Sequence, residues 1–152
     1  MRKRTRSREF ALQILYQFDL VKADIDDACE DFWKDRSDLA LSNPEKEALE
    51  KDKKDPEIRL YSENLVKGTL DHLADIDAVI EKFAENWDMK RMAFVDRNIL
   101  RLSTYEILYL EEIPVKVAIN EAVELAKRYG ESDSSKFVNG ILDRVAKSAK
   151  KP

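Results

Sequence analysis

Apolar residues recur every three or four positions along most of this chain, which is the period of an α-helix with one buried face. The run nearest the N-terminus consists of Phe10, Ala11, Ile14, Leu15 and Phe18. No segment shows the alternation of a β-strand, and only three glycines and four prolines occur. The pattern therefore predicts an all-α bundle of about seven helices.

Residues that favour helix ends divide this pattern into separate helices. The candidate N-caps are Ser7, Asp55 (followed by Pro56), Asp75 and one of Ser132, Asp133 and Ser134. Gly130 stands where a helix C-cap is expected. The segment from about residue 90 to 108 is apolar on more than one side, so we expect it to form the central, most enclosed helix.

The length and composition of the chain fit one domain. Its 152 residues are 43% hydrophobic and 38% charged, so residues 1–152 can bury a single core. Residues 34–55 are charged and poor in apolar side chains, which predicts a flexible surface insertion with at most a weak helix near residues 45–54. The single cysteine, Cys29, stands among apolar residues and is expected to be buried.

Positive charge is concentrated at the N-terminus, although the net charge is −4. This basic arm, residues 1–8, carries Arg2, Lys3, Arg4, Arg6 and Arg8. No acidic residue precedes Glu9. A compact cationic segment on an acidic chain can bind phosphate, but charge alone is equally consistent with a solvated tail.

Several classes of protein are excluded by what the sequence lacks. A serine hydrolase needs a histidine base, and His72 has no nucleophile motif near it. A zinc site needs more His and Cys than one of each, and the three glycines form no phosphate-binding loop. A structural role is expected for His72. We therefore predict that the chain is not an enzyme and has no cofactor and no metal site. No apolar stretch is long enough to span a membrane, and no secretion signal is evident, which predicts a cytoplasmic protein.

Four blocks of sequence resemble the NusB family of bacterial transcription antitermination factors. They are RKRTRSREFALQILYQFDL, VDRNILRLSTYEI, PVKVAINEAVELAKRYG and SSKFVNGILDRV, with a weaker fifth block, YSENLVKG. Their order and spacing match the family, and together they cover nearly the whole chain outside residues 34–55. That charged stretch looks longer than the family usually has.

The resemblance implies an all-helical fold of two sub-bundles, with three helices in the N-terminal half and four in the C-terminal half. It also implies binding to the boxA element of ribosomal RNA leader transcripts, as a heterodimer with the ribosomal protein NusE. The pair would then join RNA polymerase with NusA and NusG. A homodimer in the free state is also consistent with the sequence.

Two groups of residues are candidates for RNA binding. One is the basic arm together with Tyr16, which lies two helical turns beyond Arg8. The other is the start of the last helix, with Ser134, Lys136, Phe137 and Asn139. Tyr16 and Phe137 could equally be ordinary core side chains. The proposed mechanism requires both groups to contact one RNA strand.

The candidate residues for binding NusE are Tyr16, Asp96 and Arg97. The family match places Asp96 toward the ribosomal protein, where a carboxylate would pair with a basic side chain. Arg97 and Arg101 could instead brace the bundle internally. Asp133 could limit RNA affinity or act only as an N-cap.

Two other functions remain open from the sequence. One is an RNA-binding module of a ribosomal RNA cytosine methyltransferase, since those enzymes carry a NusB-like domain. The sequence ends at Lys151 and Pro152 with no methyl-donor-binding domain, so we expect a free-standing factor. The other is a bundle that binds only proteins and whose basic arm is a tail.

Overall fold

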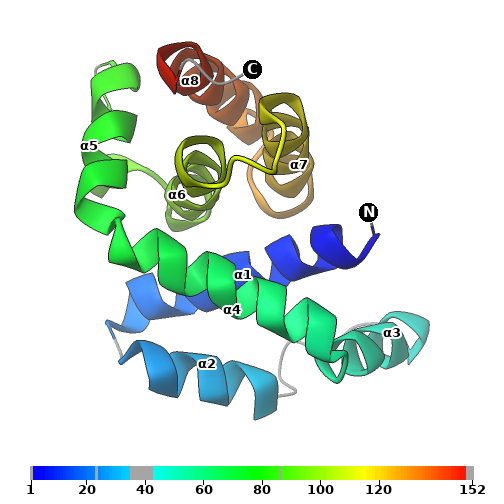
Figure 1. Cartoon of the computed structure of the whole chain (residues 1–152). Coiled ribbons are helices and arrows are strands. Elements are labelled where there is room, and N and C mark those ends of the chain that lie inside the picture. Colours follow the sequence, from blue (N-terminus) through cyan, green and yellow to red (C-terminus); the bar gives the residue numbers. More distant parts are fainter. Residues whose placement is uncertain (1, 23, 35–42, 86, 150–152) are drawn as a thin grey trace. The chain divides into compact units, whose positions relative to one another are not determined.

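Figure 1 shows the computed structural model of the chain, which describes residues 2–22, 24–34, 43–85 and 87–149. The helices are α1 (Arg2–Val21), α2 (Ile25–Lys34), α3 (Asn43–Lys53), α4 (Pro56–Asp71), α5 (Leu73–Phe83), α6 (Phe94–Tyr109), α7 (Val115–Tyr129) and α8 (Ser134–Ala149), with the short 3₁₀ helix η2 (Met89–Arg91) between α5 and α6. The described residues contain no strand, so the predicted all-α class is confirmed. The additional helix is α3, which lies in the segment expected to be an insertion.

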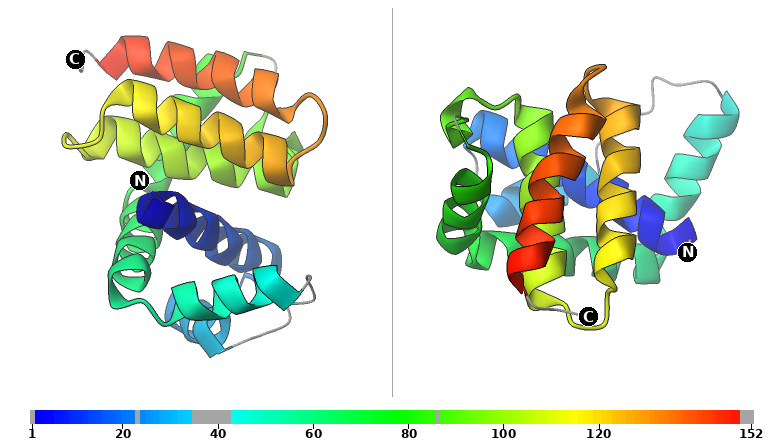
Figure 2. Two further views of the ribbon diagram at one scale, coloured as in Figure 1. Left: turned by 90° about the vertical axis from the view of Figure 1, so that its right-hand side faces the viewer. Right: turned by 90° about the horizontal axis from the view of Figure 1, so that it is seen from above.

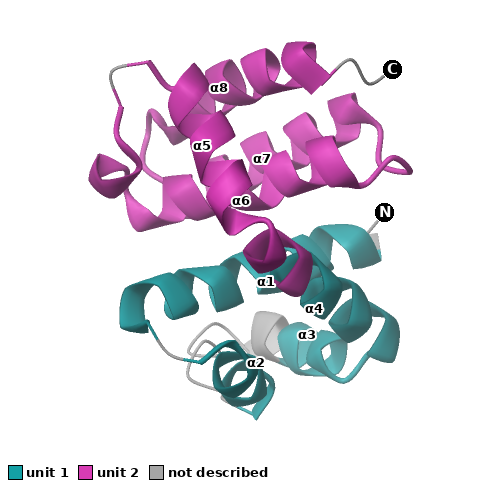
Figure 3. Ribbon diagram, turned by 60° about the vertical axis from the view of Figure 1, so that its left-hand side comes forward, with its two compact units in different colours: residues 1–66 teal, residues 67–152 magenta. Residues whose placement is uncertain are grey.

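The chain divides into two compact units, residues 1–66 and 67–152 (Figure 3). The first holds α1, α2, α3 and most of α4, and the second holds the end of α4 together with α5 to α8. The predicted division of the helices into an N-terminal and a C-terminal group is therefore confirmed, but the N-terminal group contains α3 in addition to the three helices predicted for it. The boundary falls inside α4, which contributes residues to both units.

The first helix begins at Arg2, five residues before the predicted cap, so the prediction that Ser7 caps it is wrong. Ser7 is buried inside α1, where its hydroxyl lies 2.8 Å from the Lys3 carbonyl oxygen and 3.1 Å from that of Ile58. The Ser62 hydroxyl in turn donates to the Ser7 carbonyl at 3.0 Å. Hydrogen bonds between α1 and α4 thus hold Ser7, and the basic residues before it extend the helix.

An aromatic cluster forms the core of the first unit. Phe10, Leu49 and Ile58, from α1, α3 and α4, are buried together, and Phe32 and Trp33 of α2 pack against them. The rings of Phe10, Phe32 and Trp33 meet edge to face, with centroids between 4.9 and 5.7 Å apart. Leu49 joins α3 to this core, and Cys29 is buried as predicted. Residues 35–42 lie outside the described part of the chain.

Helix α6 is the centre of the second unit and packs against α5, α7 and α8, as its two-sided apolar pattern predicts. Figure 2 shows α7 and α8 running alongside each other over α6. Ile99, Leu100, Leu102 and Ile107 on α6 are fully buried. The long buried stretch of α6 makes it the element that fixes the positions of its neighbours.

Of the other predicted helix ends, those at Asp55 and Gly130 are confirmed, and the one at Asp75 is wrong, like that at Ser7. The Asp55 carboxylate accepts the backbone N–H of Glu57 at 2.9 Å at the start of α4, and Gly130 ends α7. The prediction that Asp75 caps α5 is wrong, because the cap is His72, whose side chain makes no capping hydrogen bond. The His72 ring instead stacks on Tyr109, with centroids 4.0 Å apart, which is a structural contact. None of the described helices has the length and apolarity that crossing a membrane requires.

Candidate nucleic-acid interface

The basic residues of the N-terminus lie on the first two turns of α1 and differ in exposure. Lys3 and Arg4 are exposed, Arg6 is half-buried and Arg8 is only 2% exposed. The side chain of Arg2 lies outside the described part of the structure. The cationic cluster of the sequence therefore separates into outward-facing and inward-facing side chains.

Arg6 is held between two buried carboxylates. Its Nε donates to Asp52 Oδ2 and its Nη1 donates to Glu9 Oε1, both at 2.8 Å. Both acids are only 3% exposed, so these charge-assisted hydrogen bonds are largely shielded from water. Because Asp52 lies on α3, Arg6 links the start of α1 to the charged segment.

Tyr61 on α4 receives the guanidinium groups of two arginines of α1. The Cζ atom of Arg4 lies 4.1 Å from the ring centroid and that of Arg8 lies 6.0 Å from it, both within cation–π range. Arg4 makes no ion pair with any described residue, so it keeps its full charge at the surface. Sequence analysis missed Tyr61, because nothing in the sequence shows which side chains of α1 it meets.

Lys3 pairs with the cap of α4. Its Nζ lies 3.2 Å from Asp55 Oδ2 and 3.8 Å from Glu57 Oε2. Burial acts to raise the pKa of Asp55, but hydrogen bonds from Lys3 and from the backbone N–H groups of Glu57 and Ile58 outweigh it and leave this pKa below its usual value. Lys3 is thus exposed but already partly neutralised.

The start of α8 contains the second group of candidates. The side chains of Lys136 and Asn139 are exposed and form no hydrogen bond or ion pair with a described residue. Phe137 is half-buried. Ser134 is only 3% exposed, and its hydroxyl oxygen accepts the backbone N–H of Glu131 at 2.9 Å. The Ser134 side chain therefore supports the turn, while Lys136 and Asn139 face solvent.

Asp133 stands at the N-cap position of α8. Its carbonyl oxygen accepts the backbone N–H of Phe137 at 3.1 Å, and its side chain is exposed. Within the described residues its carboxylate forms no hydrogen bond, so the backbone of Asp133, rather than its side chain, begins the helix. The carboxylate remains beside Lys136 as a negative charge.

The candidate partner residues differ in how far they are engaged within the chain. Tyr16 on α1 is half-buried, and so is Asp96 in the first turn of α6. The Oδ1 atom of Asp96 is buried without a hydrogen bond to any described residue, which is costly unless something else satisfies it. Arg97 is only 8% exposed; its Nη1 donates to the Met89 carbonyl at 3.1 Å and its guanidinium lies over Phe94. Arg97 thus has the bracing role that the sequence left open.

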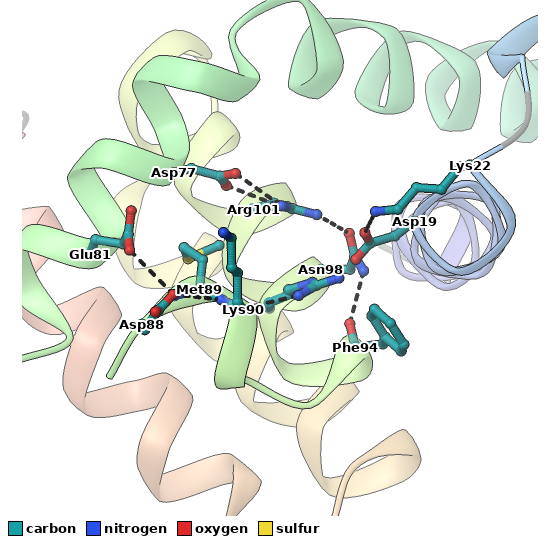
Figure 4. A network of polar contacts seen from close by, with 11 residues as sticks. Asp19, Lys22, Asp77, Glu81, Asp88, Met89, Lys90, Phe94, Asn98 and Arg101 are labelled. Carbon is teal, nitrogen blue, oxygen red and sulfur yellow. Dashed lines mark hydrogen bonds and ion pairs between the residues drawn. The ribbon is translucent and has the colours of Figure 1, made fainter. Parts of the chain in front are cut away.

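Arg101 has the same bracing role, as Figure 4 shows. Its Nε and Nη2 donate to the two carboxylate oxygens of Asp77 at 2.8 and 2.9 Å, and its Nη1 donates to Asn98 Oδ1 at 3.3 Å. This bidentate pair joins α5 to α6. Among the described residues, no cluster of His, Cys, Asp and Glu could hold a metal ion.

Comparison with known families identifies this helical arrangement. The model of the NusB family matches residues 5–147. The chain belongs to the NusB family. The resemblance seen in the four sequence blocks is thereby confirmed.

Members of the NusB family match nearly the whole chain. The transcription antitermination protein NusB of Anaeromyxobacter sp. (strain Fw109-5) is 48% identical over 95% of this chain and 90% of its own length. That of Myxococcus xanthus (strain DK1622) is 43% identical over 100% of both chains. Both relatives are named transcription antitermination proteins, which agrees with the predicted class of non-enzymatic factor.

Solved structures of the NusB family share the fold. NusB of T. maritima superimposes with a TM-score of 0.79 and 35% identity, covering 98% of this chain and 93% of its own. A structure of antitermination factors NusB and NusE in complex with dsRNA gives a TM-score of 0.80 at 28% identity, covering 97% of this chain and 98% of that chain.

Proposed function

We propose that this chain is a transcription antitermination factor that binds boxA RNA of ribosomal RNA leader transcripts as a heterodimer with NusE. Membership of the NusB family over residues 5–147 carries the proposal. The solved complex of NusB, NusE and dsRNA, which shares this fold, supports an RNA and a protein partner. Relatives named NusB and matched over at least 90% of their length favour a free-standing factor over a methyltransferase module.

The exposed cations are the first candidates to contact phosphate. Lys3 and Arg4 on α1 and Lys136 on α8 can reach solvent, whereas Arg6, Arg8 and Ser134 are engaged within the protein. We therefore assign Arg6 and Arg8 mainly to the positioning of α1. The contacts of Arg2 and Tyr16 with RNA, and the binding of one RNA strand by both α1 and α8, stay predictions.

Phe137 and Asn139 add recognition of bases to this site. A half-buried ring can stack on an unpaired base, and an exposed amide can hydrogen-bond to a base edge. Asp133 beside them would weaken phosphate binding and so limit affinity.

Asp96 is the candidate contact for NusE, because its side chain is only half-buried in the first turn of α6 and its carboxylate could pair there with a basic side chain of the partner. The heterodimer would then act with RNA polymerase, NusA and NusG in the bacterial cytoplasm. A homodimer of the free protein would compete with this assembly.

A gel-shift titration tests the function. Single-stranded boxA RNA, the same bases in scrambled order and a duplex of equal length would each be titrated with this protein, with and without NusE. We expect the boxA strand to bind most tightly, and NusE to increase its affinity. Asp96→Lys should reduce the effect of NusE, whereas Glu124→Lys on α7 should not. Equal binding of boxA and scrambled RNA in the presence of NusE would contradict the proposal.

A further inference from the structure

Trp87 lies on the surface of the second unit with half of its side chain exposed. It follows α5 and is 50% exposed, and its side chain forms no hydrogen bond with a described residue, although its backbone N–H donates to the Glu85 carbonyl. The other tryptophan, Trp33, packs against Phe10 and Phe32, and its Nε1 donates to Glu63 at 2.8 Å. Single exposed apolar residues are common in proteins, so exposure alone assigns no role to Trp87.

Two arginines donate hydrogen bonds to the backbone before and after Trp87. Before it, Arg144 Nη1 on α8 donates to the Phe83 carbonyl at 2.5 Å. After it, Arg97 Nη1 on α6 donates to the Met89 carbonyl at 3.1 Å, and the Met89 side chain is buried. Phe83 and Met89, which lie four residues before and two residues after Trp87, are thus hydrogen-bonded to α8 and α6.

Trp87 also contacts the candidate RNA-binding residue Phe137. Their ring centroids are 5.6 Å apart with an interplanar angle of 71°, an edge-to-face arrangement that leaves ring surface open to solvent. Lys136 is next to Phe137 and is exposed. Arg144 is seven residues beyond Phe137, on the same side of α8, and its ion pair with Glu85 spans 3.9 Å between exposed side chains, so it neutralises little charge.

We propose that the exposed ring of Trp87, with Phe137 packed against it edge to face, forms an aromatic platform on which an unpaired base of single-stranded RNA stacks. Lys136 and Arg144 supply positive charge for the phosphates beside that base. This inference rests on the proposed function and adds Trp87 and Arg144 to its binding residues. Stacking on a π-face tolerates any base, so the platform contributes affinity more than sequence preference.

Substitution of Trp87 tests the platform with single-stranded boxA RNA as the probe. Trp87→Ala should weaken binding about tenfold, whereas Trp87→Phe should keep most of the affinity because it keeps a ring. Trp33→Phe is the matched control and should bind as the unchanged protein does. That control also leaves Trp87 as the remaining tryptophan of the two. We expect its fluorescence to be quenched when RNA is added.

An RNA series with one abasic position at a time locates the stacked base. When the abasic position is the stacked one, the losses of binding free energy caused by the missing base and by Trp87→Ala should not add, because both changes remove the same contact. Unchanged binding by Trp87→Ala together with unchanged Trp87 fluorescence would overturn the inference while RNA binding by the unchanged protein upholds the function. Failure of the unchanged protein to bind RNA would instead refute the function. A loss confined to NusE binding would show that Trp87 contacts protein and would also overturn the platform.

Discussion

The two cationic regions of this protein differ in what surrounds their charges. At the start of α1, Arg6 is bonded to Asp52 and Glu9, and Lys3 is paired with Asp55. At the start of α8, Lys136 is exposed and has no ion pair with a described residue. A cation that already has a carboxylate partner must give up that interaction to bind phosphate. The basic arm therefore has more cationic residues than the start of α8, but fewer of its charges are available to bind phosphate than their number suggests.

The largest expected effect is on stability, from removing Arg6. Arg6→Ala removes two charge-assisted hydrogen bonds to the buried carboxylates of Asp52 and Glu9 and should lower the free energy of unfolding by about 3 kcal/mol. Arg4→Ala is the matched control, because it removes an exposed cation–π contact and should cost less than about 1 kcal/mol. Urea denaturation followed by circular dichroism measures both. Equal losses would mean that Arg6 and Arg4 do not differ as the structure indicates.

A smaller effect is expected on the salt dependence of RNA binding. Removing a cation that contacts phosphate reduces the slope of log affinity against log salt by about 0.7 for single-stranded nucleic acid. We expect this full reduction for Arg4→Ala and Lys136→Ala, and a smaller one for Lys3→Ala because Lys3 is already paired. Titrations at several salt concentrations give the slopes. If Lys3→Ala reduced the slope more than Arg4→Ala or Lys136→Ala, a cation paired with a carboxylate would contribute more to phosphate binding than an unpaired one, contrary to the proposal.

The smallest effect concerns the pKa of Asp55. Lys3→Ala removes a hydrogen bond to the carboxylate, so the pKa of Asp55 should rise toward its usual value. A lowered pKa in the folded state stabilises the protein above the unfolded pKa, and this contribution is lost as the pH falls through the folded pKa. Lys3→Ala should therefore be slightly less stable near neutral pH and lose less on acidification.

Nuclear magnetic resonance titration of the Asp55 carboxyl carbon measures this change. Lys34→Ala on α2 is a suitable control, because Lys34 pairs with Glu30 and does not contact Asp55. It should leave the Asp55 titration unchanged. An unaltered Asp55 titration in Lys3→Ala would show that the backbone hydrogen bonds alone set its pKa.

The helices could be predicted from local sequence patterns, because the buried face of a helix is formed by residues three or four positions apart. The periodicity located α6 as the central helix, and Asp55 and Gly130 marked helix ends correctly. The start of α1 could not be predicted in this way. Ser7 is a good N-cap by residue type, but its hydroxyl is taken up inside the helix and by α4.

The state of the site residues depends on contacts between distant parts of the sequence. Asp52 is 46 residues from Arg6, and it stands in a segment that looked like a solvated insertion. Tyr61 and Trp87 were missed for the same reason, since their positions beside Arg4 and Phe137 follow only from the packing of helices. The sequence showed which residues carry charge or rings but not which of them the fold had already engaged.

The bond between Arg6 and Asp52 makes α3 more than a spacer between α2 and α4. Excising residues 43–53 would delete Asp52 and Leu49. Helix α1 would lose the hydrogen bond from Arg6, and the aromatic cluster would lose the packing contacts of Leu49. If residues 43–53 are replaced by the corresponding segment of another family member, the residue at position 6 should therefore be replaced by that member's residue as well.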